Sequence, residues 1–172
     1  MSGNLQSIKG TLTSVEALDL FFVEKKFIPN QSINFGENSK LEIKSIDESE
    51  KFTLDYNRGK ISLKYSVQTR CRSYIQLIRL DTGGSWHNNP QERVICHPED
   101  PFYVVHDDCV GKKFQPGEPH IHFYREGYED AWAYPIPDWI KDPHDRRRTF
   151  FEFLEKCNVL DKPSIQAGIL DE

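Results

Sequence analysis

Alternation of polar and apolar residues is the feature that most restricts how this chain can fold. It is clearest across residues 60–69, where every second side chain is apolar: Ile61, Leu63, Tyr65 and Val67. Because successive side chains of a strand point to opposite faces, this run predicts a β-strand with one buried and one polar face. Shorter runs of the same kind occupy residues 32–35, 40–46 and 51–56. The chain is therefore predicted to form an antiparallel sheet with one solvated side.

Turn-forming residues between the runs indicate how the strands pair. The predicted hairpins join residues 51–56 to 60–69 and residues 120–126 to 131–136. Their turns are Asn57-Arg58-Gly59 and Gly127. A further run, residues 74–80, is apolar on both faces, which is typical of a central, more buried strand.

Two helices are predicted near the ends of the chain. Thr13 and Glu16 form a capping-box pattern at the start of a helix over residues 14–26. Asp142 before Pro143 predicts the start of a second helix, near the C-terminus. The apolar stripe of that helix is Phe150, Phe153, Leu154 and Cys157.

The length of 172 residues suits a single domain with a substantial core. We predict one α+β domain over residues 1–172, with a twisted antiparallel sheet of about five to seven strands. The N-terminal and C-terminal helices pack on this sheet. Residues 85–118 are predicted to form a long, irregular insertion, which is usually a sign of function.

The charge and the ends of the sequence restrict the partners. A net charge of −5 and a pI near 5.7 exclude a global attraction to nucleic acid or to an anionic membrane. The first residues lack the apolar run of a signal peptide, and no stretch reaches the ~18 apolar residues of a membrane span. Four scattered cysteines favour reduced thiols. A cytoplasmic protein without a membrane partner is expected.

The segment of residues 120–126 carries the strongest candidates for catalysis. Alternation places His120, His122 and Tyr124 on one face, and Ile121 and Phe123 on the core side. The two imidazoles are therefore expected to point away from the core, and histidine can act as acid or base near neutral pH. The predicted catalytic set is His87, His120, His122, Tyr124 and Glu126.

A locally basic strand offers a binding surface for a phosphodiester. The predicted substrate-binding residues are Arg58, Lys60, Lys64, Gln68, Arg70 and Arg72. RNA cleavage without a metal needs a base, an acid and positive donors for the phosphate, and the two groups of residues together supply them. The alternative interpretation is the solvated face of an ordinary sheet, where lysine and arginine serve solubility.

The insertion contains four residues of types that bind zinc: Cys96, His97, His106 and Cys109. Their spacing matches no standard zinc finger or ribbon. No cofactor is therefore expected, with a zinc site in the insertion as the alternative.

Three motifs in residues 52–137 resemble an uncharacterised family of small bacterial and phage-borne proteins, a domain of unknown function. The motifs are F-x-L-D-x-x-R-G, G-x-x-H-x-N-P and P-H-x-H-x-Y-x-E-G-Y-x-D-x-W-A. The residues that carry them include Phe52, Leu54, Asp55, Arg58, Gly59, Arg70, Arg72, His87, Asn89, Pro90, His120, His122, Tyr124, Glu126, Gly127, Asp130 and Trp132. The resemblance implies no activity. Residues 91–118 depart from the family pattern, which favours a partner surface particular to this protein.

Two functions follow as hypotheses. The first is a metal-independent, ribonuclease-like protein from a mobile-element, toxin or defence context, which cleaves RNA or another phosphodiester with paired histidines beside a basic strand. The alternative is a non-catalytic phage or mobile-element protein with an anti-defence role. Such a protein would bind and inhibit a host or defence complex through residues 91–118.

Overall fold

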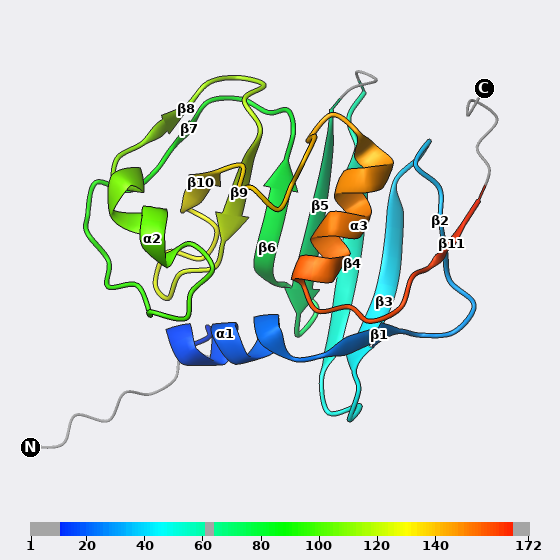
Figure 1. Cartoon of the computed structure of the whole chain (residues 1–172). Helices are drawn as coiled ribbons and strands as arrows, with labels where there is room; N and C mark the ends of the chain where they lie inside the picture. The colour runs from blue at the N-terminus through cyan, green and yellow to red at the C-terminus, as the bar shows by residue number, and fades with distance from the viewer. Residues whose placement is uncertain (1–10, 61–63, 167–172) are drawn as a thin grey trace, which may run out of the picture.

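The computed structural model describes residues 11–60 and 64–166, and a seven-stranded antiparallel sheet forms its centre (Figure 1). The strands, in order across the sheet, are β1 Lys25–Phe27, β3 Ser39–Ser45, β4 Lys51–Arg58, β5 Tyr65–Cys71, β6 Ile75–Asp81, β9 His120–Phe123 and β10 Ala133–Pro135. The predicted α+β class with an antiparallel sheet is confirmed.

Shorter elements surround this sheet. The helices are α1 Ser14–Phe22, α2 Tyr103–His106 and α3 Arg146–Lys156, and a 3-10 turn covers Asp107–Cys109. Two small sheets pair β2 Ser32–Ile33 with β11 Ser164–Ile165, and β7 His87–Asn88 with β8 Lys113–Phe114. Within the two described stretches, no helix has the length and apolar content to cross a bilayer.

The first helix begins as predicted and ends early. Thr13 and Glu16 form the capping box, with each side chain bonded to the other residue's backbone N–H. The predicted helix over residues 14–26 stops at Phe22, because Val23 is extended and Lys25 already pairs with Ser45 in the sheet. Pairing with β3 therefore outweighs the helical pattern of the sequence at residues 25 and 26.

Two other boundaries also differ from the prediction. Strand β4 continues through Arg58, where a turn was expected, and its partner β5 begins at Tyr65. Residues 61–63 of the predicted strand lie outside the described part of the chain. Helix α3 begins at Arg146, because the carboxylate of Asp145, and not that of Asp142, accepts a bond from the N–H of Arg148.

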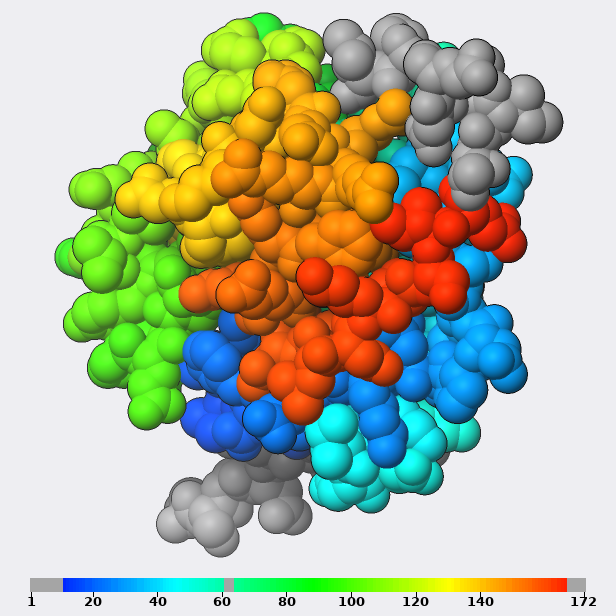
Figure 2. All heavy atoms as spheres, turned by 45° about the vertical axis from the view of Figure 1, so that its right-hand side comes forward, coloured from blue at the N-terminus to red at the C-terminus, as the bar shows by residue number. Residues whose placement is uncertain are grey.

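The two faces of the sheet differ in what covers them. Helix α3 and the C-terminal segment, orange to red in Figure 2, cover one face, where the Phe150 ring packs edge-on against Tyr56 and Phe35. The opposite face of the central strands carries polar side chains. The alternation of residues thus separates a hydrophobic core from a polar face, as predicted.

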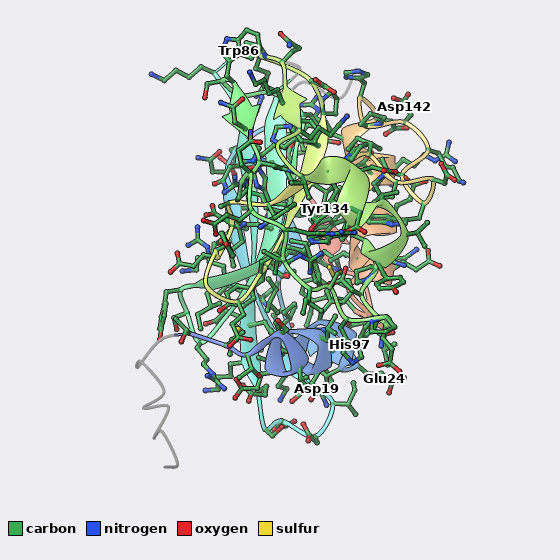
Figure 3. The ribbon with its side chains drawn as sticks, turned by 90° about the vertical axis from the view of Figure 1, so that its left-hand side faces the viewer. Asp19, Glu24, Trp86, His97, Tyr134 and Asp142 are labelled. Carbon is green, nitrogen blue, oxygen red and sulfur yellow. The ribbon has the colours of Figure 1, made fainter. Side chains whose placement is uncertain are left out.

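The insertion of residues 85–118 closes the free edge of the sheet. The Asn89 side chain donates to the carbonyl of Ala133 in β10 at 2.7 Å and accepts from its N–H at 2.9 Å. In Figure 3, Trp86 lies at the top of the molecule and His97 beside helix α1, so the insertion runs along much of this side. This pairing covers backbone groups that would otherwise invite association with another strand.

Core contacts anchor the insertion on the sheet. Phe102 stacks on Tyr134 with ring centroids 4.4 Å apart. The buried carboxylate of Asp100 forms a two-pronged ion pair with the buried guanidinium of Arg125. Since an unpaired charge there would be costly, the insertion is an integral part of the fold.

The buried Lys25 joins three elements at the end of α1. Its Nζ donates to the carbonyl of Phe21 at 2.8 Å, of Val23 at 2.7 Å and of Cys157 at 2.9 Å. Burial lowers the pKa of this ammonium to about 8. The three carbonyls therefore compensate the desolvation of one charge and connect α1 to the end of α3.

We expect Lys25→Met to lower the free energy of unfolding by about 3 kcal/mol, because three carbonyls lose their shared donor. Lys26→Met is the matched control: its exposed ion pair with Glu48 contributes less than about 1 kcal/mol. Urea unfolding of both variants measures the difference. Equal effects of the two substitutions would contradict this role of Lys25.

Candidate functional site

The polar face is organised in rows of residues that face one another across the strands. One row runs through Asp55, Gln68, Arg79, His122 and Ala133. The next row runs through Asn57, Ser66, Asp81, His120 and Pro135. The antiparallel register therefore places an arginine and an aspartate of β6 directly beside the two histidines of β9.

Both histidines of β9 are oriented by backbone carbonyls. His120 Nδ1 lies 2.7 Å from the carbonyl oxygen of Glu118, and His122 Nδ1 lies 2.7 Å from that of Asp130. Because a carbonyl can only accept, each Nδ1 carries a proton, and the Nε2 of each ring is left as the atom that can accept or donate a proton. These Nε2 atoms face Asp81 Oδ2, at 3.9 Å from His120 and 3.4 Å from His122.

His87 of β7 completes a cluster of three imidazoles. Its ring stacks on His120 at a centroid distance of 5.7 Å and meets His122 edge-on at 4.6 Å. Its Nε2 lies 3.0 Å from Asn89 Oδ1 and 3.1 Å from the carbonyl oxygen of Ala131. The loop after β6 thus brings the third predicted histidine onto the same face.

Arg79 supplies the positive charge of the cluster. Its Nε donates to Asp81 Oδ2 at 2.8 Å, and its Nη1 donates to Asp130 Oδ2 at 3.2 Å and to Gln76 Oε1 at 2.9 Å. Arg79 and Asp81 were not among the predicted site residues. Their signal in the sequence is the alternation Arg79-x-Asp81, which places both on one face of a strand.

Burial sets the protonation of the cluster. Burial lowers the pKa of His120, and repulsion from His122 and Arg79 acts in the same direction. Burial likewise lowers the pKa of His87. Burial alone would raise the pKa of Asp81, but its bonds with His122 and Arg79 outweigh that effect and lower it. Near pH 7 the site therefore combines the Asp81 carboxylate, the Arg79 guanidinium and neutral imidazoles at His87 and His120.

The histidine rings are less open to solvent than predicted. They do lie on the polar face, yet His120 is only 4% exposed and His122 only 2%. The covering elements are β7 and β8, since the rings of His87 and Phe114 pack directly on His120. The prediction of an open surface is therefore wrong: the two histidines form a covered site. The side chains of Arg79 and Asp81 lie beside it and are more accessible.

Two predicted catalytic residues lie outside the cluster. The hydroxyl of Tyr124 accepts from the N–H of Leu12 and donates to its carbonyl, both at 2.9 Å. The carboxylate of Glu126 accepts from the N–H of Ser14. Because β9 ends at Phe123, the alternation that placed Tyr124 beside the histidines no longer holds. Both side chains anchor the segment that leads into α1.

The six predicted substrate-binding residues divide into two groups. Gln68 and Arg70 lie on the polar face, where both contact Asp55 Oδ2. The Arg58 guanidinium folds back onto the carbonyl of Gly36, away from the cluster. Lys60, Lys64 and Arg72 lie at the ends of β4 and β5, outside the two rows. The basic surface of the site is therefore smaller than predicted.

Asp81, His120 and His122 are the one group of three potential metal ligands found in the described stretches, with ligand atoms within 4.8 Å of one another. The guanidinium of Arg79 already binds the Asp81 oxygen that faces both rings. A metal ion at that oxygen would therefore be repelled by the positive charge of Arg79.

The zinc candidates of the insertion do not form such a group. His106 bonds through its two ring nitrogens to the Tyr134 hydroxyl and the Val94 carbonyl. His97 accepts from the N–H of Glu99, and Cys109 is buried. These contacts are structural.

The lowered pKa values predict how stability depends on pH. Unfolded histidine titrates near pH 6.5, whereas folded His87 and His120 stay neutral to lower pH. The unfolded state then binds more protons, so the free energy of unfolding should fall as the pH drops from about 7 to 5. The groups facing His120 are Asp81, His87, His122 and Arg79.

Urea unfolding at several pH values measures this slope. The double substitution His87→Gln and His120→Gln should flatten it, while His97→Gln with His144→Gln, both on exposed loops, should leave it unchanged. An unchanged slope in the first variant would show that the buried rings do not titrate as argued.

Comparison with known proteins identifies the family and no function. The model of a family of unknown function, DUF6978, matches residues 12–159, a longer region than the three motifs cover. No curated protein and no solved structure matches. Since the match covers most of the described sequence, the chain belongs to this family of unknown function.

Proposed function

We propose that this protein cleaves phosphodiester bonds in RNA by metal-free acid–base catalysis. The observation that carries the proposal is the convergence of two imidazole Nε2 atoms on one carboxylate beside a guanidinium. Two histidines with fixed ring orientations supply the base and the acid that this reaction needs, and a nearby cation can bind the phosphate.

The environments of the two rings support different roles in this proposal. His120, whose pKa is lowered by burial, is neutral and accepts the proton of the 2′-hydroxyl on Nε2. The freed oxygen attacks phosphorus and the bond from phosphorus to the 5′-oxygen breaks. His122, whose Nε2 lies 3.4 Å from Asp81, is the proposed acid and donates a proton from Nε2 to the leaving oxygen. The products are a 2′,3′-cyclic phosphate and a 5′-hydroxyl.

Arg79 is the residue proposed to donate hydrogen bonds to the phosphate. Its guanidinium lies in the same row as His122 and bonds the same carboxylate. Such a cation stabilises the charge that develops on the phosphate oxygens. Unregulated cleavage of RNA harms a cell, so this activity fits a toxin or defence effector that acts in the cytoplasm.

We expect purified protein to cleave single-stranded RNA in the presence of EDTA. His120→Gln and His122→Gln should each lower the rate by about 10²–10⁴-fold, because each removes a proton-transfer group. His97→Gln is the matched control and should keep full activity. Gel analysis of labelled RNA gives the rates. Absence of cleavage by the wild type would refute the proposal. Full activity in a variant that carries both His120→Gln and His122→Gln would also refute it.

A second candidate function is protein binding through the insertion. The observation that favours it is a group of apolar side chains on residues 94–105, with Ile95 95% exposed and Val104 90% exposed. Together with the neighbouring Tyr103 and Val105 they leave an apolar surface facing solvent. Exposed apolar groups of this kind often mark an interaction site.

The double substitution Ile95→Asp and Val104→Asp tests this candidate. It should abolish capture of a stoichiometric protein partner that the wild type retains, because two charges would enter the apolar contact. Lys113→Asp is a control on the opposite part of the insertion. Capture that is unaffected by the double substitution would remove the candidate.

A further inference from the structure

A pocket of about 300 Å³ lies on the polar face next to the histidine cluster. The residues that line it include Arg70, Tyr74, Gln76, Arg79, Glu129 and Asp130. Its volume is near the lower end of ligand pockets, about 300–1,000 Å³, which suits a ligand of the size of a pyrimidine nucleotide.

The pocket and the histidine cluster share a wall. Arg79 lines the pocket and bonds Asp81 of the cluster at 2.8 Å. Asp130 also lines the pocket, and its backbone carbonyl orients the His122 ring. A ligand in the pocket would therefore place its next chemical group beside His122 and Arg79.

The lining combines an aromatic ring with groups of both charges. Tyr74 is 61% exposed, and an exposed aromatic ring is a platform on which a base can stack. The carboxylates of Glu129 and Asp130 can accept hydrogen bonds from an exocyclic amino group, as acidic side chains do from cytosine N4. Arg70 adds a positive charge for a phosphate.

Two polar atoms without hydrogen-bond partners lie beneath this pocket, in a row of residues that crosses three strands. Thr53, Arg70 and Gln76 face one another across β4, β5 and β6. Among the residues that the structure describes, Thr53 Oγ1 and Gln76 Nε2 are buried without a hydrogen-bond partner. Buried donors without partners are rare in folded proteins, and an oxygen of a ligand in the pocket would supply the acceptor that the Gln76 amide lacks.

We infer that this pocket binds the base of an RNA nucleotide next to the cleaved phosphate, and that it selects cytosine over uracil. Cytosine offers an amino group to the two carboxylates and a carbonyl oxygen to the Gln76 amide. Uracil presents a second carbonyl oxygen where cytosine has the amino group, and that oxygen would face a carboxylate. The choice of an RNA nucleotide as the ligand rests on the proposed cleavage of RNA.

Binding of CMP and UMP tests the inference separately from catalysis. Titration calorimetry with wild-type protein should give at least a tenfold tighter dissociation constant for CMP, since one good base contact discriminates by about that much or more. Tyr74→Ala should weaken both nucleotides, and Glu129→Gln should reduce the preference for CMP. Phe22→Ala, which removes an exposed aromatic ring on α1 outside the pocket, is the control.

The outcomes distinguish the two proposals. Equal binding of CMP and UMP, or binding that Tyr74→Ala leaves unchanged, overturns the inference even if RNA is cleaved. Tighter binding of CMP by a protein that cleaves no RNA supports the pocket and removes the proposed catalysis. Chemical-shift mapping on wild-type protein gives a second measurement that needs no variant: CMP should shift the amides of residues 74–79 and 129–130.

Discussion

The antiparallel register between β6 and β9 is the constraint on which the whole site depends. It places Arg79 opposite His122 and Asp81 opposite His120. A slip by one residue would turn both imidazoles toward the core side, where Ile121 and Phe123 now pack. The burial of these two apolar side chains therefore fixes the position of the histidines, since the register that fills the core is also the register that assembles the cluster.

The insertion takes part in the site as much as the sheet does. It supplies His87, and its β8 strand places Phe114 against the ring of His120. By covering the rings it lowers the local dielectric constant, which is why burial is the main cause of the lowered pKa of His120. The contact of Asn89 with the β10 edge then ties this cover to the sheet.

Alternation alone predicted the sheet and the face on which the histidines lie, because both follow from the period of two in a regular strand. It failed where the strands are irregular or end. Strand β6 pairs with β5 through a register shift at Thr69 and Arg70, so the sequence of β6 has apolar residues in both phases and does not mark Arg79 and Asp81 as a polar pair. Tyr124 follows the end of β9 and turns to Leu12 instead. The fold of the insertion depends on distant contacts that have no local signal.

The placement of Arg79 decides between two chemistries of the same three residues. Two imidazoles and a carboxylate are also ligands that a divalent metal accepts. However, the guanidinium occupies the side of Asp81 that faces both rings. At about 4 Å and an effective dielectric constant near 20, two unit charges repel each other by about 4 kcal/mol, and a divalent ion would double this. This repulsion would oppose the attraction of the Asp81 carboxylate for the ion. The bonds of Arg79 to Gln76, Asp81 and Asp130 hold its guanidinium in place, so a phosphate that approaches meets a fixed cation beside two imidazoles.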